Sequence, residues 1–162
     1  MAGWLHGFSA GGGGDYPEAE AAALKAGVGF HWRAGKGERL VLHVADAPPH
    51  DGDAGDYLRA AKAAAGNGVQ IFTLGASGVA AQSEFLMRQA AVATGGWYLF
   101  LTDDSGVGNA HAEPTIPCYR VIQLSKFLTQ VLGAELSGQR QEAGSGEVIR
   151  EVGSYAAGVC RN

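Results

Sequence analysis

The residues best suited to chemistry lie in the run GGGGDYPEAE, residues 11–20, where four glycines precede Asp15, Pro17 and Glu18. Glycine frees the backbone and allows close approach, which suits a phosphate loop, a flexible linker or the mouth of a metal site. A phosphate loop needs either Lys followed by Ser or Thr, or a third spaced glycine entering a helix, and the run has neither. Acidic residues at the helix start would also repel a phosphate. We therefore expect a tight turn that presents Asp15.

A long polar loop, residues 102–117, is the second place where oxygen ligands gather. Its candidate ligands are Asp103, Asp104, Asn109, His111 and Glu113. They are numerous enough for Ca²⁺, but they lack the alternate spacing and the glycine placement of a calcium-binding loop. Loops of this length are usually functional or disordered. We expect a lid or a partner-contact loop here.

The sequence shows no catalytic set. None of the four serines considered has a nucleophile elbow; they are Ser9, Ser77, Ser83 and Ser105. Cys118 and Cys160 are too few and too far apart for a zinc site or a disulfide scaffold. We expect two free thiols, since a bond between them would require an oxidising compartment. The sequence therefore predicts a protein that is not an enzyme.

Composition narrows the range of partners. The 162 residues carry a net charge of −4 without a Lys/Arg cluster, which argues against a nucleic-acid surface. No apolar run approaches the roughly 20 residues of a membrane helix, and the first residues lack the pattern of a secretory signal. We expect no membrane contact and, for the chain as written, a cytoplasmic location.

Helical and strand patterns alternate along most of the chain. A helix is predicted to open at Asp15, with Glu18 as capping-box partner, and to stop near Gly27. Further helices are expected from Asp53 and over 80–96. The apolar runs between them predict buried strands at 39–45, 69–76 and 97–101. This alternation predicts an α/β fold, a doubly wound parallel sheet with about three core strands.

Side-chain positions refine these elements. His43, inside the strand at 39–45, is expected to be a hydrogen-bonded core histidine rather than a ligand. The helix over 80–96 should pack through an apolar side formed by Phe85, Leu86, Ala90 and Val92. A last amphipathic helix is predicted at about 118–132, followed by a polar tail with a short helix at about 147–152.

Three stretches together carry a family resemblance: GGGGDYPEA, VADAPPHD and EFLMRQAAVATGGWYLFL. In this order they resemble the second half of a von Willebrand factor type A (vWA) domain, in particular a bacterial group with the loop Gly-Gly-Gly-Asp-x-Pro-Glu. The resemblance covers most of residues 10–135. It implies a partial vWA-like, Rossmann-like domain at 1–135, with a C-terminal tail at 136–162.

The resemblance also implies a metal site. The family has a metal-ion-dependent adhesion site (MIDAS) at the carboxyl ends of its strands, and there Asp15 matches a second-loop ligand and Asp46 a ligand after a strand. The family's Asp-x-Ser-x-Ser motif is missing, so the chain resembles a domain that begins partway through. The implied cofactor is Mg²⁺, or Mn²⁺ or Ca²⁺, held weakly or not at all. The alternatives of a helix cap for Asp15 and a turn residue for Asp46 stay open.

These features lead to two hypotheses of function. The first is a non-enzymatic protein-interaction module that binds a protein partner through a divalent cation. The second is an α/β enzyme or a nucleotide or small-ligand binder that uses loops 11–18, 46–53 and 102–115. Without the family's first strand, the strand at 39–45 should expose an edge, which predicts a homodimer, a partner that covers it, or poor solubility. A full-length parent would be periplasmic or secreted.

Overall fold

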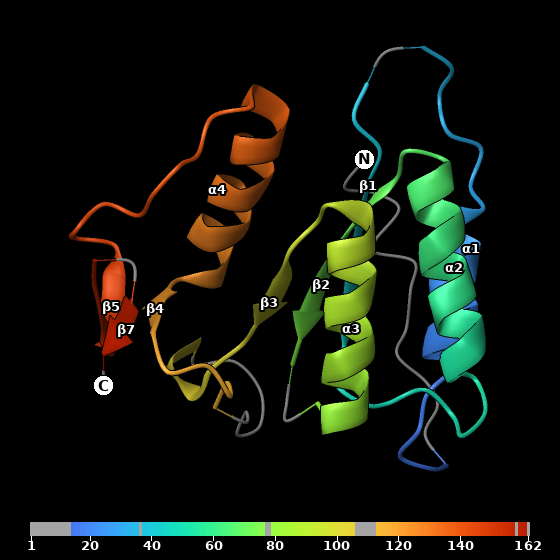
Figure 1. Ribbon diagram of the computed structural model, residues 1–162, viewed down its shortest axis with the longest axis horizontal. Helices are drawn as coiled ribbons and strands as arrows, with labels where there is room; N and C mark the ends of the chain where they lie inside the picture. Colours follow the sequence, from blue (N-terminus) through green and yellow to red (C-terminus); the bar gives the residue numbers. More distant parts are fainter. Residues whose placement is uncertain (1–13, 36, 77–78, 106–112, 158, 162) are drawn as a thin grey trace.

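The computed structural model describes residues 14–35, 37–76, 79–105, 113–157 and 159–161. Its centre is a parallel sheet of three strands in the order β1-β2-β3: β1 (Leu40–Ala45), β2 (Gln70–Gly75) and β3 (Tyr98–Phe100). One face carries α1 (Glu20–Val28), α2 (Ala54–Gly66) and α3 (Ala81–Thr94), and α4 (Leu124–Ser137) lies across the other (Figure 1). The predicted α/β class is confirmed, and the fold is consistent with part of a Rossmann-like domain.

Two apolar clusters hold these layers together. The cluster between the sheet and α1–α3 contains fully buried side chains, among them Leu24, Tyr57, Ile71 and Leu86. On the opposite face, Phe72, Leu74 and Leu99 of the sheet pack with Val131 of α4. Burial of apolar surface on both faces is the main stabilising term for such a sheet.

Glycines end α3 and allow its close approach to the sheet. Gly95 caps the helix in the left-handed conformation at φ 72°, which residues with a Cβ adopt at a cost. A Cβ on the next residue, Gly96, would collide with the backbone carbonyl of Ile71. The pair Gly95–Gly96 therefore lets the chain turn sharply from α3 into β3.

The first helix begins later than predicted. Its first residue is Glu20, its N-cap is Ala19, and no side chain caps it. Asp15 does not cap this helix because residues 14–19 lie outside it, and Glu18 uses its backbone N–H in a hydrogen bond to Pro48. The tertiary contact thus replaces the capping box that the local sequence suggested.

Exposure differs from the prediction at β1 and α3. β1 is buried on one side only, and Leu42 and Val44 are 41% and 55% exposed because α4 covers β2 and β3 more than the β1 edge. On α3 the predicted Leu86 and Ala90 are buried, whereas Phe85 and Val92 are exposed. The buried side of α3 also includes Ser83, Met87 and Ala91.

The region after residue 113 was predicted least well. Residues predicted to start the last helix form β4 (Tyr119–Ile122), and α4 begins only at Leu124. The predicted helix at 147–152 is instead β5 (Val148–Val152), antiparallel to β4. Two short strands follow, β6 (Ser154–Ala156) and β7 (Val159–Arg161). The expected boundary after residue 135 falls within the last turn of α4.

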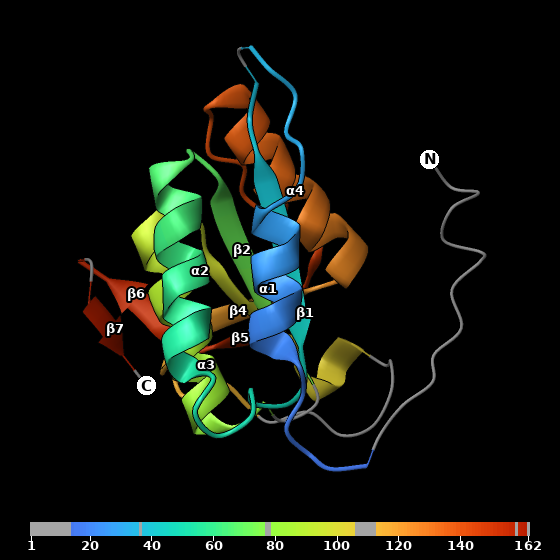
Figure 2. The same cartoon turned by 90° about the vertical axis from the view of Figure 1, so that its right-hand side faces the viewer.

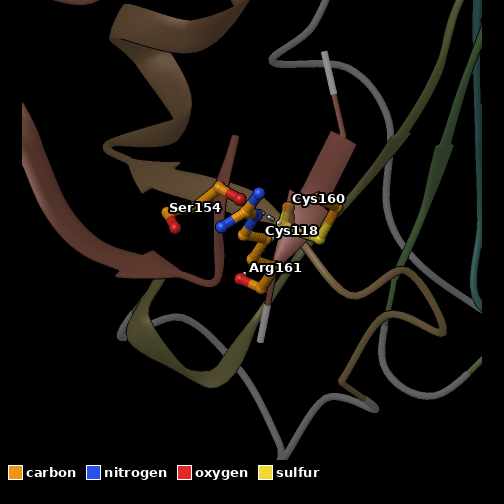
Figure 3. Close-up of a disulfide and its surroundings, with 4 residues drawn as sticks. All are labelled: Cys118, Ser154, Cys160 and Arg161. Carbon is orange, nitrogen blue, oxygen red and sulfur yellow. Dashed lines mark hydrogen bonds between the residues drawn. A yellow bond between two sulfur atoms is a disulfide. The ribbon is translucent and has the colours of Figure 1, made fainter. Parts of the chain in front are cut away.

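A disulfide bond joins Cys118 and Cys160, so the expectation of free thiols was wrong (Figure 3). The bond links the start of β4 to β7 across 42 residues, with the two Cα atoms 5.9 Å apart. Gly153 lies against it at φ 61°, and a Cβ there would lie 2.5 Å from the Sγ of Cys118. Only glycine fits this turn between β5 and β6 without strain.

Candidate functional site

The loops that carry Asp15 and Asp46 lie side by side at the carboxyl end of β1. The backbone N–H of Glu18 donates to the carbonyl oxygen of Pro48 at 2.9 Å, and Glu18 forms a parallel bridge with Pro49. Ligands of open α/β sheets bind at this end of the strands. The structure therefore joins the two loops, while a cation shared by both carboxylates stays a prediction.

Both aspartates face water. The Asp15 side chain is 66% exposed, and its Oδ2 lies 3.6 Å from Nδ1 of His50. Asp46 is exposed in the bend directly after β1. Such a contact between exposed side chains is weak, so it leaves Asp15 able to bind a cation. Within the described ranges no group of three or more His, Cys, Asp or Glu side chains could hold a metal ion. A cation here would depend on two carboxylates and water.

Beneath these loops lies a buried polar cluster of Glu20, His43 and Ser83. The Nε2 of His43 lies 2.9 Å from Oε1 of Glu20, and the Ser83 hydroxyl donates to the same carboxylate at 3.2 and 3.3 Å. All three residues are buried. The prediction that His43 is a hydrogen-bonded core histidine is confirmed. A carboxylate this deeply buried is tolerated only because it has such partners.

Tyr57 of α2 completes the surroundings of this cluster. Its ring meets the His43 ring edge-on with centroids 5.6 Å apart, and the side chain is fully buried. Burial, and secondarily the charge of Glu20, raises the pKa of the Tyr57 hydroxyl far above its usual value. This hydroxyl has no hydrogen-bond partner among the described residues. The phenol therefore stays neutral and acts as packing.

The hydrogen bond between Glu20 and His43 holds together the points where the two candidate loops join α1 and β1. Glu20 is the first residue of α1, directly after the loop of Asp15, and His43 precedes Asp46 by three residues on β1. Their hydrogen bond ties α1 to β1 at that end of the sheet. Sequence reasoning missed Glu20, although its spacing gave a signal, since it shares the i, i+4, i+8 helical stripe of buried Leu24 and Val28.

In the acidic loop after β3, Asp104 and Glu113 bind Arg150 of the C-terminal region and are not arranged as ligands around a central cation. Arg150 of β5 donates from Nε and Nη2 to Oδ2 of Asp104 at 2.9 and 2.6 Å, and from Nη2 to Glu113 at 2.9 Å. The hydrogen bonds from Arg150 hold the pKa of Asp104 below its usual value. Two of the candidate calcium ligands thus already neutralise an arginine. Asn109 and His111 lie outside the described residues.

Tyr119 extends this arginine cluster. Its hydroxyl donates to Glu113, and its ring centroid lies 5.6 Å from the Arg150 guanidinium carbon. Burial, followed by the hydrogen bond to Glu113, raises the pKa of Tyr119. The Tyr119 ring also meets Phe100 of β3 at 90°. The cluster therefore links β3, β4 and β5 and has a structural role.

A small hollow lies between β3, β4 and α4. Its volume is about 80 Å³ and its lining is mainly apolar, with Leu99, Val121 and Phe127 among the lining residues. Pockets for drug-sized ligands usually measure roughly 300–1,000 Å³. This hollow is too small for a nucleotide.

Comparison with protein-family models, with curated proteins and with solved structures gave no match. The class of protein therefore rests on the fold itself. The chain is an α/β protein whose three-stranded parallel sheet is flanked by helices, with two acidic loops joined at the carboxyl end of β1.

Proposed function

We propose that this chain is a non-enzymatic protein-interaction module of the vWA kind. In this proposal Asp15 and Asp46 hold a divalent cation weakly and present it to an acidic side chain of a protein partner. The observation that carries the proposal is the hydrogen bond from Glu18 to Pro48, because it joins the two acidic loops. The family and the roles of the aspartates come from the sequence resemblance.

The chemistry of the two carboxylates fits a weakly held hard cation. Mg²⁺ takes oxygen ligands in octahedral geometry and usually keeps several waters, which suits exposed carboxylates such as that of Asp15. Mn²⁺ and Ca²⁺ accept the same ligands. Because the sequence contains no Asp-x-Ser-x-Ser motif, we expect a dissociation constant on the order of millimolar. The bound cation would offer an open coordination place to a partner's carboxylate.

The candidate nucleophiles support a binding role. The Ser83 hydroxyl donates to the Glu20 carboxylate and is fully buried, so a substrate could not reach it. Cys118 and Cys160 are bonded to each other and offer no thiolate. Ser9 and Ser77 lie outside the described residues.

The disulfide is evidence on the cellular compartment in which the protein folds. Within the described part of the chain, no helix is both long and apolar enough to span a bilayer. Disulfide bonds form and persist in oxidising compartments, so the Cys118–Cys160 bond favours the periplasm or the exterior over the cytoplasm. Protein isolated from such a compartment should show no reactive thiol when unfolded without reductant.

The proposal is tested by titrating isotope-labelled protein with Mn²⁺ and following amide signals by NMR. Paramagnetic broadening reports a bound Mn²⁺ even when binding is weak. We expect selective broadening at residues 14–18 and 46–51, and on the order of tenfold weaker binding for Asp15→Asn and for Asp46→Asn, since each removes one of two carboxylates. Excess Mg²⁺ should reverse the broadening.

Asp51→Asn is the matched control, because Asp51 is an exposed aspartate on the same loop as Asp46 that the proposal leaves out of the site. It should bind Mn²⁺ as the wild type does. Broadening that is unchanged in both Asp15→Asn and Asp46→Asn would contradict the proposal. Equal weakening of Mn²⁺ binding in Asp51→Asn would mean that the acidic surface attracts Mn²⁺ without a specific site.

A further inference from the structure

β1 lies at one edge of the sheet, where its outer backbone groups have no strand partner among the described residues (Figure 2). The amide of Gln70 donates to the carbonyl of Arg39, and the amide of Ala76 donates to the carbonyl of Ala45. Odd-numbered residues of β1 therefore direct their backbone groups toward β2. Since these directions alternate along a strand, Leu40, Leu42 and Val44 direct their N–H and C=O groups outward.

The same three residues place their side chains on the α4 face of the sheet. Leu40 packs against the cluster of α4, whereas Leu42 and Val44 are 41% and 55% exposed. On the helix face, a groove of about 490 Å³ runs along the edge and is lined by Leu24, Phe30 and β1. Phe30 is 70% exposed. An edge that is unpaired and apolar on both faces is a template for strand addition.

Charges are divided between the two ends of β1. In the sequence, the segment leading into the strand carries three basic residues and one glutamate, namely Arg33, Lys36, Arg39 and Glu38. The loops at the other end carry five carboxylates, namely Asp15, Glu18, Asp46, Asp51 and Asp53. A strand that pairs antiparallel with a copy of itself sets the basic end of each copy beside the acidic end of the other. A parallel arrangement would set like charges together.

We propose that two copies of this chain pair antiparallel through their β1 edges and form one continuous six-stranded sheet. The symmetry axis is perpendicular to the sheet, so the helices α1–α3 of both copies lie on the same face. The outward groups of Leu42 and Val44 hydrogen-bond to those of the partner. The occupant of the edge is thus a second copy of the chain.

The alternation of backbone directions and the charges at the two ends of β1 decide which residues of the two copies lie opposite one another. Outward-facing residues must lie opposite one another, and two registers that satisfy this rule place Leu42 opposite Leu42 or Leu42 opposite Val44 of the partner. The first register sets Glu38 opposite the partner's Asp46, which is unfavourable. The second brings Leu42 and Val44 of both copies into one apolar cluster and is the register we expect. This inference does not depend on the proposed cation.

Sedimentation velocity over a wide concentration range, with chelator present, tests the pairing. The wild type should approach twice 16.7 kDa at high concentration. Leu42→Lys should raise the dimer dissociation constant by at least about tenfold, because a charge on an edge strand blocks strand addition. Leu58→Lys is the matched control: Leu58 on α2 is 40% exposed, close to the 41% of Leu42. It should leave the dissociation constant unchanged.

Amide hydrogen exchange locates the contact. In the dimer the amides of Leu42 and Val44 should exchange at least about tenfold more slowly than in the dilute monomer, since they gain hydrogen bonds only across the edge. A monomer at all concentrations overturns the proposal, whether or not these amides are protected. A dimer with unprotected Leu42 and Val44 amides overturns it as well, because the copies then meet elsewhere. Equal effects of Leu42→Lys and Leu58→Lys on the dimer dissociation constant also overturn the proposal.

Discussion

The sheet with α1–α3 and the segment 113–161 are stabilised by different interactions. In the first region a continuous set of buried apolar side chains joins helices to strands, with Ile71 fully buried at its centre. Among the described residues of the second, the buried apolar side chains are Cys118, Val121 and Val131. That segment is held by the disulfide and by the arginine cluster around Arg150. Hydrophobic burial thus dominates the first region, whereas the second combines the apolar contact of α4 with these specific links.

The largest difference should appear when one chemical change is made in both regions. Ile71→Ala in β2 should destabilise the protein by about 2–5 kcal/mol, because it leaves a cavity in a packed core. Ile149→Ala in β5 removes the same atoms from a side chain that is 56% exposed and should cost less than about 1 kcal/mol. Urea unfolding followed by circular dichroism measures both. Similar losses in the two variants would mean that the regions do not differ in this way.

Removing the disulfide should have the next largest effect, and it should act locally. The double variant Cys118→Ser with Cys160→Ser frees a loop that spans 42 residues and should lose about 2–4 kcal/mol. Amide exchange should accelerate in β4, β5 and β7 while amides of β2 keep their protection. Accelerated exchange in β2 to the same extent would show instead that the two regions unfold as one unit.

The comparison also explains what the sequence could predict. Buried apolar runs with helices between them specify β1, β2 and β3 through local periodicity, and all three appear close to the predicted bounds. The helix predicted from Asp15 failed because Glu18 bonds to Pro48, thirty residues away in the chain. Such a contact leaves no trace in the local pattern.

Long-range contacts also explain why the predictions for the C-terminal segment were wrong. Tyr119–Ile122 form a strand because β5 pairs with them, and β5 was predicted as a helix from its own short sequence. Cys118 and Cys160 gave no spacing signal, since only the fold brings them together. At the candidate site, the sequence predicted the core role of His43 but not its partner Glu20. Whether Asp15 and Asp46 share a cation is a question for the Mn²⁺ titration.

The smallest expected effect is a loss of stability in acid that is confined to the arginine cluster. The guanidinium of Arg150 holds the pKa of Asp104 below its usual value, so folding favours the charged carboxylate. Its stabilising contribution is therefore complete above the unfolded value of about 3.9 and is lost as the pH falls through the lower folded pKa. Because the Asp104 carboxylate and the Arg150 guanidinium are both partly open to water, which screens their attraction, the contribution is small.

Asp104→Asn isolates this contribution from other carboxylates that protonate in the same range. Amide exchange at β5, where Arg150 lies, should accelerate in the wild type as the pH falls below about 4, after correction for intrinsic rates. The variant should exchange faster at neutral pH and show a smaller further change in acid, because it has no charge left to lose. β2 amides report the apolar region and should not distinguish the two proteins. Parallel pH profiles at β5 would mean that Arg150 and Asp104 do not hold this segment.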